Sequence, residues 1–290
     1  MAGYQIFTDA TADFNVQSIQ TPPFVHIIPM QLTIGGETYT YGPGGTIDTR
    51  KFYAMQRAGA YAATTQIAPD TYFRHFEPAL RAGLDILYLG FSSAMSGTFQ
   101  TARLCARELR EQYPGRKIVC VDTRCASVGE GLLVCEAARR QAEGYSLEQL
   151  ANWAACSQCH ICHWFTVDVL DHLRHGGRIS SAAAAFGTAL QIKPLLHVDP
   201  DGRLAVLEKP RGRKQAIRAQ LTRMEASWAP EIGTSVNIGH GDCLEAAQQL
   251  EEAVRRQFPQ AKTEITDIGP IIGAHTGPGM LAVAHWGSIR

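Results

Sequence analysis

Two short apolar runs, residues 85–91 and 117–121, flank a single helical pattern at residues 98–112. Each run lacks the polar alternation of a half-exposed strand, so each predicts a strand that is buried on both faces. Strands of this kind belong to parallel sheets, because the helices that connect them cover both faces of the sheet. The chain is therefore predicted to have an α/β fold.

The first half of the chain continues this alternation of strands and helices. A strand is predicted at residues 4–8, and strands at 26–34 and 37–41 form a hairpin across the Gly35-Gly36 turn. Further helices are predicted at residues 48–57, with Asp48 as the N-cap, at 69–82 and at 129–143. Another helix is predicted to begin directly after Ser146, which caps it. Residues 1–162 are thus expected to form an N-terminal α/β domain with a mainly parallel sheet.

The pattern changes from residue 163 onward. Strands are predicted at residues 164–169, 195–198, 204–208, 236–240 and 263–268, and helices at 171–175, 180–190, 214–226 and 244–257. A glycine-rich tail, residues 269–279, precedes a last strand. Residues 163–290 are expected to form a second α/β domain with a smaller mixed sheet, and a chain of 290 residues is long enough for two such domains.

The charge of the chain is balanced, with 27 basic and 27 acidic residues, and both halves are close to neutral. A protein that binds mainly to nucleic acid phosphates needs a basic surface, so nucleic acid is not an expected partner. The first residues lack the basic and apolar regions of a signal peptide, and no stretch resembles a membrane span. We expect a cytoplasmic protein with at most transient membrane contact.

Eight cysteines in a cytoplasmic protein are expected to be free thiols. Cys156, Cys159 and Cys162 have the spacing of a partial metal site and would share roughly one face of a helix, and His160 or His163 could supply a fourth ligand. A metal or redox regulator is one interpretation of this cluster. Structural zinc sites usually contain two spaced ligand pairs, so plain thiols are the favoured interpretation, and neither a metal nor a cofactor is expected.

Three short polar segments could carry the function: residues 63–66, 92–98 and 273–279. The second follows a buried strand and begins a helix, which is where open α/β sheets bind ligands and where free N–H groups suit an anion. The chain contains neither a nucleophile-elbow motif nor a phosphate-binding loop. A phosphotransferase or acyl hydrolase that uses Ser96 with His275 as base remains an alternative.

In their order and combination, several motifs resemble those of the DegV family of bacterial fatty-acid-binding proteins over nearly the full length of the chain. The matching segments are residues 8–13, 64–66, 92–98, 173–180, 193–195, 211–214 and 273–279. The resemblance implies two domains that hold one long-chain fatty acid in a tunnel between them. It also implies a carrier without activity of its own, which presents the acid to a partner kinase for conversion to an acyl phosphate.

The resemblance also implies which residues hold the ligand. The carboxylate-binding hydroxyls of the family fall on Thr64, with Thr65 beside it, and on Ser96, and the late histidine of the family falls on His275. Arg178 is expected to support this site. Two glycines of the matched motifs, Gly97 and Gly277, are also included as supporting residues.

A basic cluster at residues 209–218 has two interpretations: a solvated surface, or a docking site for the kinase through Arg211 and Arg213. The physical argument for a carrier is separate from these motifs. Burial of an acyl tail contributes roughly 0.8 kcal/mol per methylene, whereas a stranded carboxylate costs several kcal/mol. A fatty-acid carrier therefore needs an apolar cavity that ends at hydrogen-bond donors.

Overall fold

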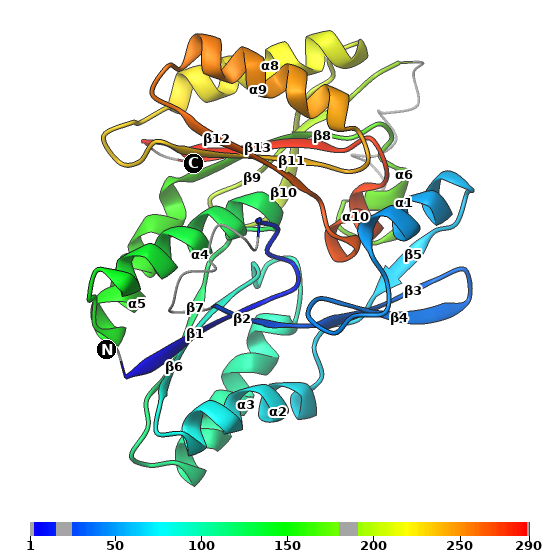
Figure 1. Ribbon diagram of the computed structural model, residues 1–290. Helices are drawn as coiled ribbons and strands as arrows, with labels where there is room; N and C mark the ends of the chain where they lie inside the picture. The colour runs from blue at the N-terminus through cyan, green and yellow to red at the C-terminus, as the bar shows by residue number, and fades with distance from the viewer. Residues whose placement is uncertain (1–2, 16–24, 180–190, 289) are drawn as a thin grey trace.

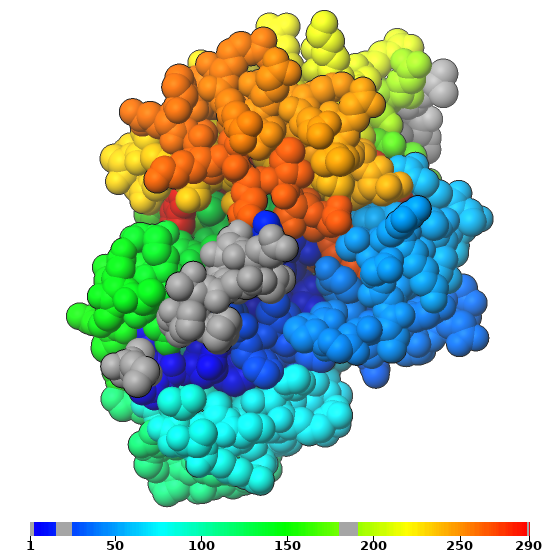
Figure 2. All heavy atoms as spheres, in the orientation of Figure 1, coloured from blue at the N-terminus to red at the C-terminus, as the bar shows by residue number. Residues whose placement is uncertain are grey.

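The computed structural model describes residues 3–15, 25–179, 191–288 and 290. Figure 1 shows two sheets stacked with helices between them and on both outer sides. Figure 2 shows the C-terminal segments, yellow to orange, packed directly on the blue and green segments of the first half. The predicted helix at residues 180–190 lies outside the described residues. Among the described helices, none is long and apolar enough to cross a membrane.

The first sheet is parallel, with strand order β2-β1-β6-β7. Its strands are β1 (Tyr4–Asp9), β2 (His26–Ile28), β6 (Asp85–Gly90) and β7 (Ile118–Asp122). The helices α2 (Pro69–Arg81) and α3 (Thr98–Gln112) cover one face, and α4 (Ser127–Ala142) and α5 (Leu147–Ser157) cover the other (Figure 1). The prediction of a mainly parallel N-terminal sheet is confirmed.

The predicted strand at residues 26–34 is divided in two. Pro29 separates β2 from β3 (Met30–Ile34), and a proline cannot donate a ladder hydrogen bond. β3 instead forms a small antiparallel sheet, order β4-β3-β5, with β4 (Glu37–Tyr41) and β5 (Ala62–Thr64). The helix α1 (Thr49–Arg57) lies between β4 and β5 in the chain, and Asp48 caps it as predicted by accepting a bond from the Lys51 N–H.

The second sheet is mixed and has six strands in the order β10-β9-β8-β13-β11-β12. These are β8 (Ile161–Thr166), β9 (Leu195–Val198), β10 (Leu204–Glu208), β11 (Ser235–His240), β12 (Lys262–Asp267) and β13 (Leu281–Trp286). With six strands it is larger than the four-stranded parallel sheet, so the expectation of a smaller sheet was wrong. β8 begins at Ile161, directly after a short 3-10 turn, η2 (Gln158–His160).

The outer face of the six-stranded sheet is covered by α8 (Gly212–Ser227) and α9 (Leu244–Gln257), as Figure 1 shows. Its inner face rests on α4. Because α4 lies between the two sheets, it is buried along most of its length, and it packs in one core with Ile6 of β1, Leu87 of β6 and Ile161 of β8. This shared core joins the two halves of the chain.

Two short helices complete the region between the sheets: α6 (Asp171–His175), which was predicted, and α10 (Pro270–Thr276). The sequence predicted only a glycine-rich tail where α10 lies. Pro270 occupies the first turn of the helix, where a missing N–H costs nothing, and the helix buries Ile271 and Ile272. Gly277, at φ +73°, ends the helix.

His285 of β13 is buried, and its hydrogen bonds lead us to expect that stability depends on pH. The Trp164 indole N–H donates to His285 Nε2 at 3.0 Å, and His285 Nδ1 contacts the Trp286 carbonyl at 2.9 Å. An indole only donates and a carbonyl only accepts, so His285 must be neutral with its proton on Nδ1. Burial lowers the pKa of His285 to about 4, although the Trp286 carbonyl opposes this shift.

Unfolding restores the ordinary pKa of His285, so below about pH 6.5 the unfolded chain binds more protons than the folded one. Stability should therefore fall with decreasing pH, by about 2 kcal/mol at pH 5 from this residue alone. We expect a His285→Gln variant to lose that part of the slope when urea unfolding is compared at pH 8 and pH 5. An equal slope in both proteins would contradict the assignment.

Candidate functional site

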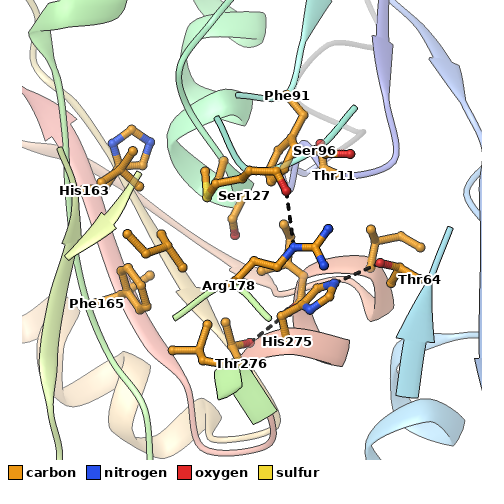
Figure 3. A pocket seen from close by; sticks show the side chains of 18 of the residues that line it. Thr11, Thr64, Phe91, Ser96, Ser127, His163, Phe165, Arg178, His275 and Thr276 are labelled. Carbon is orange, nitrogen blue, oxygen red and sulfur yellow. Dashed lines mark hydrogen bonds between the residues drawn. The ribbon is translucent and has the colours of Figure 1, made fainter. Parts of the chain in front are cut away.

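A cavity of about 210 Å³ lies between the parallel sheet, the inner face of the six-stranded sheet, and α10. This space is many times the roughly 10–15 Å³ that a single water molecule needs. Figure 3 shows the side chains that surround it. The apolar residues of the lining include Met30, Phe91, Met95, Val128, Phe165, Leu173, Val198, Leu204, Ile271, Ile272, Met280 and Val283.

The polar end of the cavity is formed by Thr64 and His275. Thr64 is the last residue of β5, and His275 lies in the last turn of α10, which packs on β5. Their side chains meet at 2.8 Å, between Thr64 Oγ1 and His275 Nε2 (Figure 3). Burial, with a smaller contribution from the positive charge of Arg178, lowers the pKa of His275 to about 4. The imidazole is therefore neutral near pH 7.

Arg178 brings a positive charge to the same end of the cavity. Its Nε donates to the Met95 carbonyl at 3.2 Å, and its Nη1 donates to the Gly176 carbonyl at 2.6 Å. Burial lowers the pKa of the guanidinium from its ordinary value. None of the described lining residues is acidic, so no carboxylate of the lining balances this charge.

Ser96 lines the cavity at the start of α3, as predicted. Its Oγ donates to Thr98 Oγ1 at 3.0 Å and accepts from the Thr98 N–H at 3.2 Å. Gly97 follows it, and a Cβ there would lie 2.2 Å from Gln66 Oε1. The absence of a side chain at Gly97 thus lets the segment after β5 approach the segment before α3.

Of the other two residues predicted for the ligand site, Thr65 lines the cavity and Gly277 does not. Thr65 is an exposed residue, and its backbone N–H donates to the Gln31 carbonyl. Gly277 is not among the lining residues; a Cβ there would lie 2.3 Å from His172 Cδ2, so this glycine allows α10 to pack closely against α6. Its supporting role is structural.

The two arginines predicted for docking lie in different environments. Arg211 is exposed. Arg213 is bound internally: its Nη2 lies 2.8 Å from Asp168 Oδ1 and 2.6 Å from the Gly279 carbonyl. The guanidinium of Arg213 is therefore held by partners within the fold, whereas Arg211 is exposed, and a docking role for Arg213 stays a prediction.

A buried acidic network lies behind one wall of the cavity and was not predicted. Thr11 lines the cavity, and its Oγ1 lies 2.5 Å from Asp9 Oδ1 and 2.9 Å from Glu130 Oε2. A hydroxyl has one hydrogen, so one of these contacts requires a protonated carboxyl group. Burial, and next the charge of Asp9, raises the pKa of Glu130 well above its ordinary value, so Glu130 is the neutral partner.

Asp13 of the same sequence motif connects both halves of the fold. Its carboxylate accepts from Ser127 Oγ at 2.6 Å and from the Gly269 N–H at 2.8 Å, at the starts of α4 and α10. Burial raises the pKa of Asp13 to about 7, although these hydrogen bonds lower it. The motif at residues 8–13 therefore shapes the cavity wall and the position of α10.

The cysteine cluster does not share one helix face. Cys156 and Cys159 are exposed at the end of α5 and in η2, whereas Cys162 is buried on β8. The described residues contain no group of three or more potential metal ligands. Of this sequence cluster, only His163 lines the cavity.

The family model described as "Uncharacterised protein, DegV family" matches residues 4–286. A DegV domain-containing protein of Clostridium perfringens is 37% identical to this chain over 290 residues, which cover 100% of this chain and 99% of that protein. The chain belongs to the DegV family. A DegV domain-containing protein of Lactococcus lactis is 34% identical over 280 residues, with 97% of this chain and 96% of that protein covered.

Solved DegV structures share the fold of this DegV chain. The DegV protein of Thermus thermophilus, described as binding fatty acid, is 28% identical with a TM-score of 0.86, covering 98% of this chain and 99% of that chain. DegV of Bacillus subtilis, described as a fatty acid binding protein, is 26% identical with a TM-score of 0.82 and covers 98% of this chain and 99% of that chain. The predicted family and α/β class are confirmed.

Proposed function

We propose that this DegV protein binds one long-chain fatty acid in the cavity between its sheets and presents the acid to a partner kinase, which forms an acyl phosphate. One observation carries the first part: a largely apolar cavity ends at Thr64, His275 and Arg178, and no described lining residue is acidic. Such a cavity suits a molecule with one long apolar part and one anionic end.

The polar end can hold a carboxylate without a covalent step. If His275 Nε2 donates to Thr64 Oγ1, the hydroxyl hydrogen of Thr64 is free to donate to the ligand. Ser96 supplies a second hydroxyl, which can turn from Thr98 toward the ligand. The charge of Arg178, whose hydrogen bonds go to main-chain carbonyls, favours an anion nearby. These groups offset the cost of burying the head group.

The arrangement favours a carrier over an enzyme that uses Ser96 as a nucleophile. A nucleophilic serine needs a base within hydrogen-bond reach. The hydrogen bonds of Ser96 Oγ go to Thr98, whereas His275 Nε2 pairs with Thr64. These contacts support a role for His275 in orienting a hydroxyl donor over a role in activating Ser96.

The family resemblance supports the proposed presentation to a kinase. The Fatty Acid Kinase B3 protein of Streptococcus pneumoniae, described as loaded with linoleic acid, shares this fold at 22% identity, with a TM-score of 0.87 over 98% of this chain and 100% of that chain. We include Arg211 in the proposal as a residue that contacts the kinase, since it is exposed on the basic segment.

Mass spectrometry of the organic extract of the purified, denatured protein tests the proposal. We expect one long-chain fatty acid per chain. The enzyme alternative instead predicts an empty protein that turns over acyl or phosphoryl substrates without a partner. Finding that activity, with no acid in the extract, would rule out the carrier.

A further inference from the structure

Alternate residues of β8 show where the cavity stops. Side chains alternate between the two faces of a strand, so Ile161, His163 and Phe165 point to the same side of the sheet. Phe165 and His163 line the cavity. Ile161 does not; it is fully buried in the core that α4 and α5 form, beside Leu132 and Leu150. His163 is therefore the last cavity residue on this strand before solid packing begins.

His163 also lies far from the predicted head-group site. Figure 3 shows it on the side of the pocket away from Thr64 and His275, with Phe165 below it. An acyl chain whose carboxylate lies at Thr64 would extend across the cavity toward β8. The residue that it would approach at its far end is His163.

The imidazole of His163 is held in place from two sides. Its Nδ1 lies 3.1 Å from the Ile161 carbonyl, which only accepts, so Nδ1 carries the proton. A Cβ at Gly129, in the first turn of α4, would lie 1.9 Å from His163 Nε2. The ring thus occupies space that exists because Gly129 has no side chain. Within the described part of the chain, Nε2 has no hydrogen-bond partner.

We infer that His163, seated against Gly129, forms the closed end of the acyl cavity and sets the longest chain that the protein retains. This inference rests on the proposed function and extends it to the choice of ligand. The neutral ring, whose pKa burial lowers well below its ordinary value, presents an uncharged surface to the end of the chain. A smaller residue at position 163 lengthens the cavity, and a side chain at position 129 displaces the ring into it.

The two positions predict opposite changes in chain length. Removal of the ring by His163→Ala opens room for about two methylene groups, so preference should shift about tenfold toward an acid two carbons longer. Gly129→Ala should shift preference toward an acid two carbons shorter. In the double variant, the methyl group added at position 129 no longer meets a ring, so retention of the longer acids that Gly129→Ala excludes should return.

The experiment uses delipidated full-length protein and an equimolar mixture of tetradecanoic, hexadecanoic, octadecanoic and eicosanoic acids, with the retained acids quantified by mass spectrometry. Circular dichroism melting curves show whether each variant folds. If one single variant does not fold, the length profile of the other single variant decides the result. If the unaltered protein retains an acid but the folded variants keep the same length profile, the inference is wrong and the proposed function stands. If the unaltered protein retains none, both are wrong.

Discussion

A variant with Thr64→Val and Ser96→Ala together should bind long-chain fatty acids at least about 100-fold more weakly than the unaltered protein. Each substitution removes a hydroxyl from the polar end of the cavity while the apolar lining remains. A hydrogen bond to a charged group contributes roughly 1.5–3 kcal/mol, so the loss of two corresponds to two orders of magnitude or more in Kd. Calorimetric titration of delipidated protein with hexadecanoic acid measures the effect.

Loss of binding must be separated from loss of folding. Ser96 Oγ also accepts the Thr98 N–H just before α3, so Ser96→Ala is expected to cost about 1 kcal/mol of stability through the loss of this hydrogen bond. Thr38→Val, an exposed change of the same chemistry on β4, serves as the matched control and should leave Kd unchanged. An unaltered Kd in the folded double variant would remove Thr64 and Ser96 from the head-group site.

A large effect on stability at neutral pH is expected from Gly131→Ala in α4. A Cβ at this position would lie 2.2 Å from the Asp13 backbone carbonyl oxygen and 3.0 Å from Phe14 Cβ. Helix propensity alone favours alanine over glycine by about 1 kcal/mol, whereas overpacking a core costs typically 1–3 kcal/mol. Because the clash is with backbone, the upper end of that range applies, and we expect a net loss of about 2 kcal/mol.

Urea unfolding measures this loss, and Gly115→Ala is the control. Nothing lies within 4 Å of a Cβ at Gly115, so that change should alter the free energy of unfolding by less than about 0.5 kcal/mol. If Gly131→Ala is as stable as the control, α4 does not pack closely against Asp13 and Phe14, and the described packing between the two sheets is wrong.

The sequence predicted what depends on local pattern. The helices α3 and α9, the strands β9 and β10, and the cap at Asp48 lie where periodicity and turn chemistry placed them. Motif resemblance identified Thr64, Ser96, His275 and Arg178, all of which line one cavity. Each of these features is fixed by a few neighbouring residues, or by a motif whose meaning does not depend on the rest of the chain.

What the sequence did not predict depends on contacts between distant residues. The helix α10 follows a glycine, ends at one and is short, and it is stabilised by burial of Ile271 and Ile272 between other elements. Local propensity gives little signal for such a helix. Arg213 belongs to a basic segment, and contacts with residues distant in sequence, Asp168 and Gly279, distinguish it from exposed Arg211.

The same holds for the walls of the cavity. The sequence indicates a role for His163 only as a member of the cysteine cluster, because spacing along the chain cannot show that it faces Gly129 of α4. No sequence pattern assigns a role to Asp9, yet its carboxylate accepts a hydrogen bond from Thr11, a residue that lines the cavity. Gly129, which the ring of His163 faces, and Tyr88 of β6, which donates to Asp9, both come from other elements, so a single sequence without the fold gives no sign of these contacts.

The position of α4 between the two sheets restricts how a guest molecule enters. A hinge motion that separated the six-stranded sheet from the parallel sheet would separate α4 from one of the two sheets. It would expose core residues such as Leu132 and Ile161. Exposure of a single such side chain costs roughly 1.5–3 kcal/mol, and many would be exposed together. We therefore expect a ligand to enter and leave through a local opening at the edge of the cavity, while the two sheets keep their relative position.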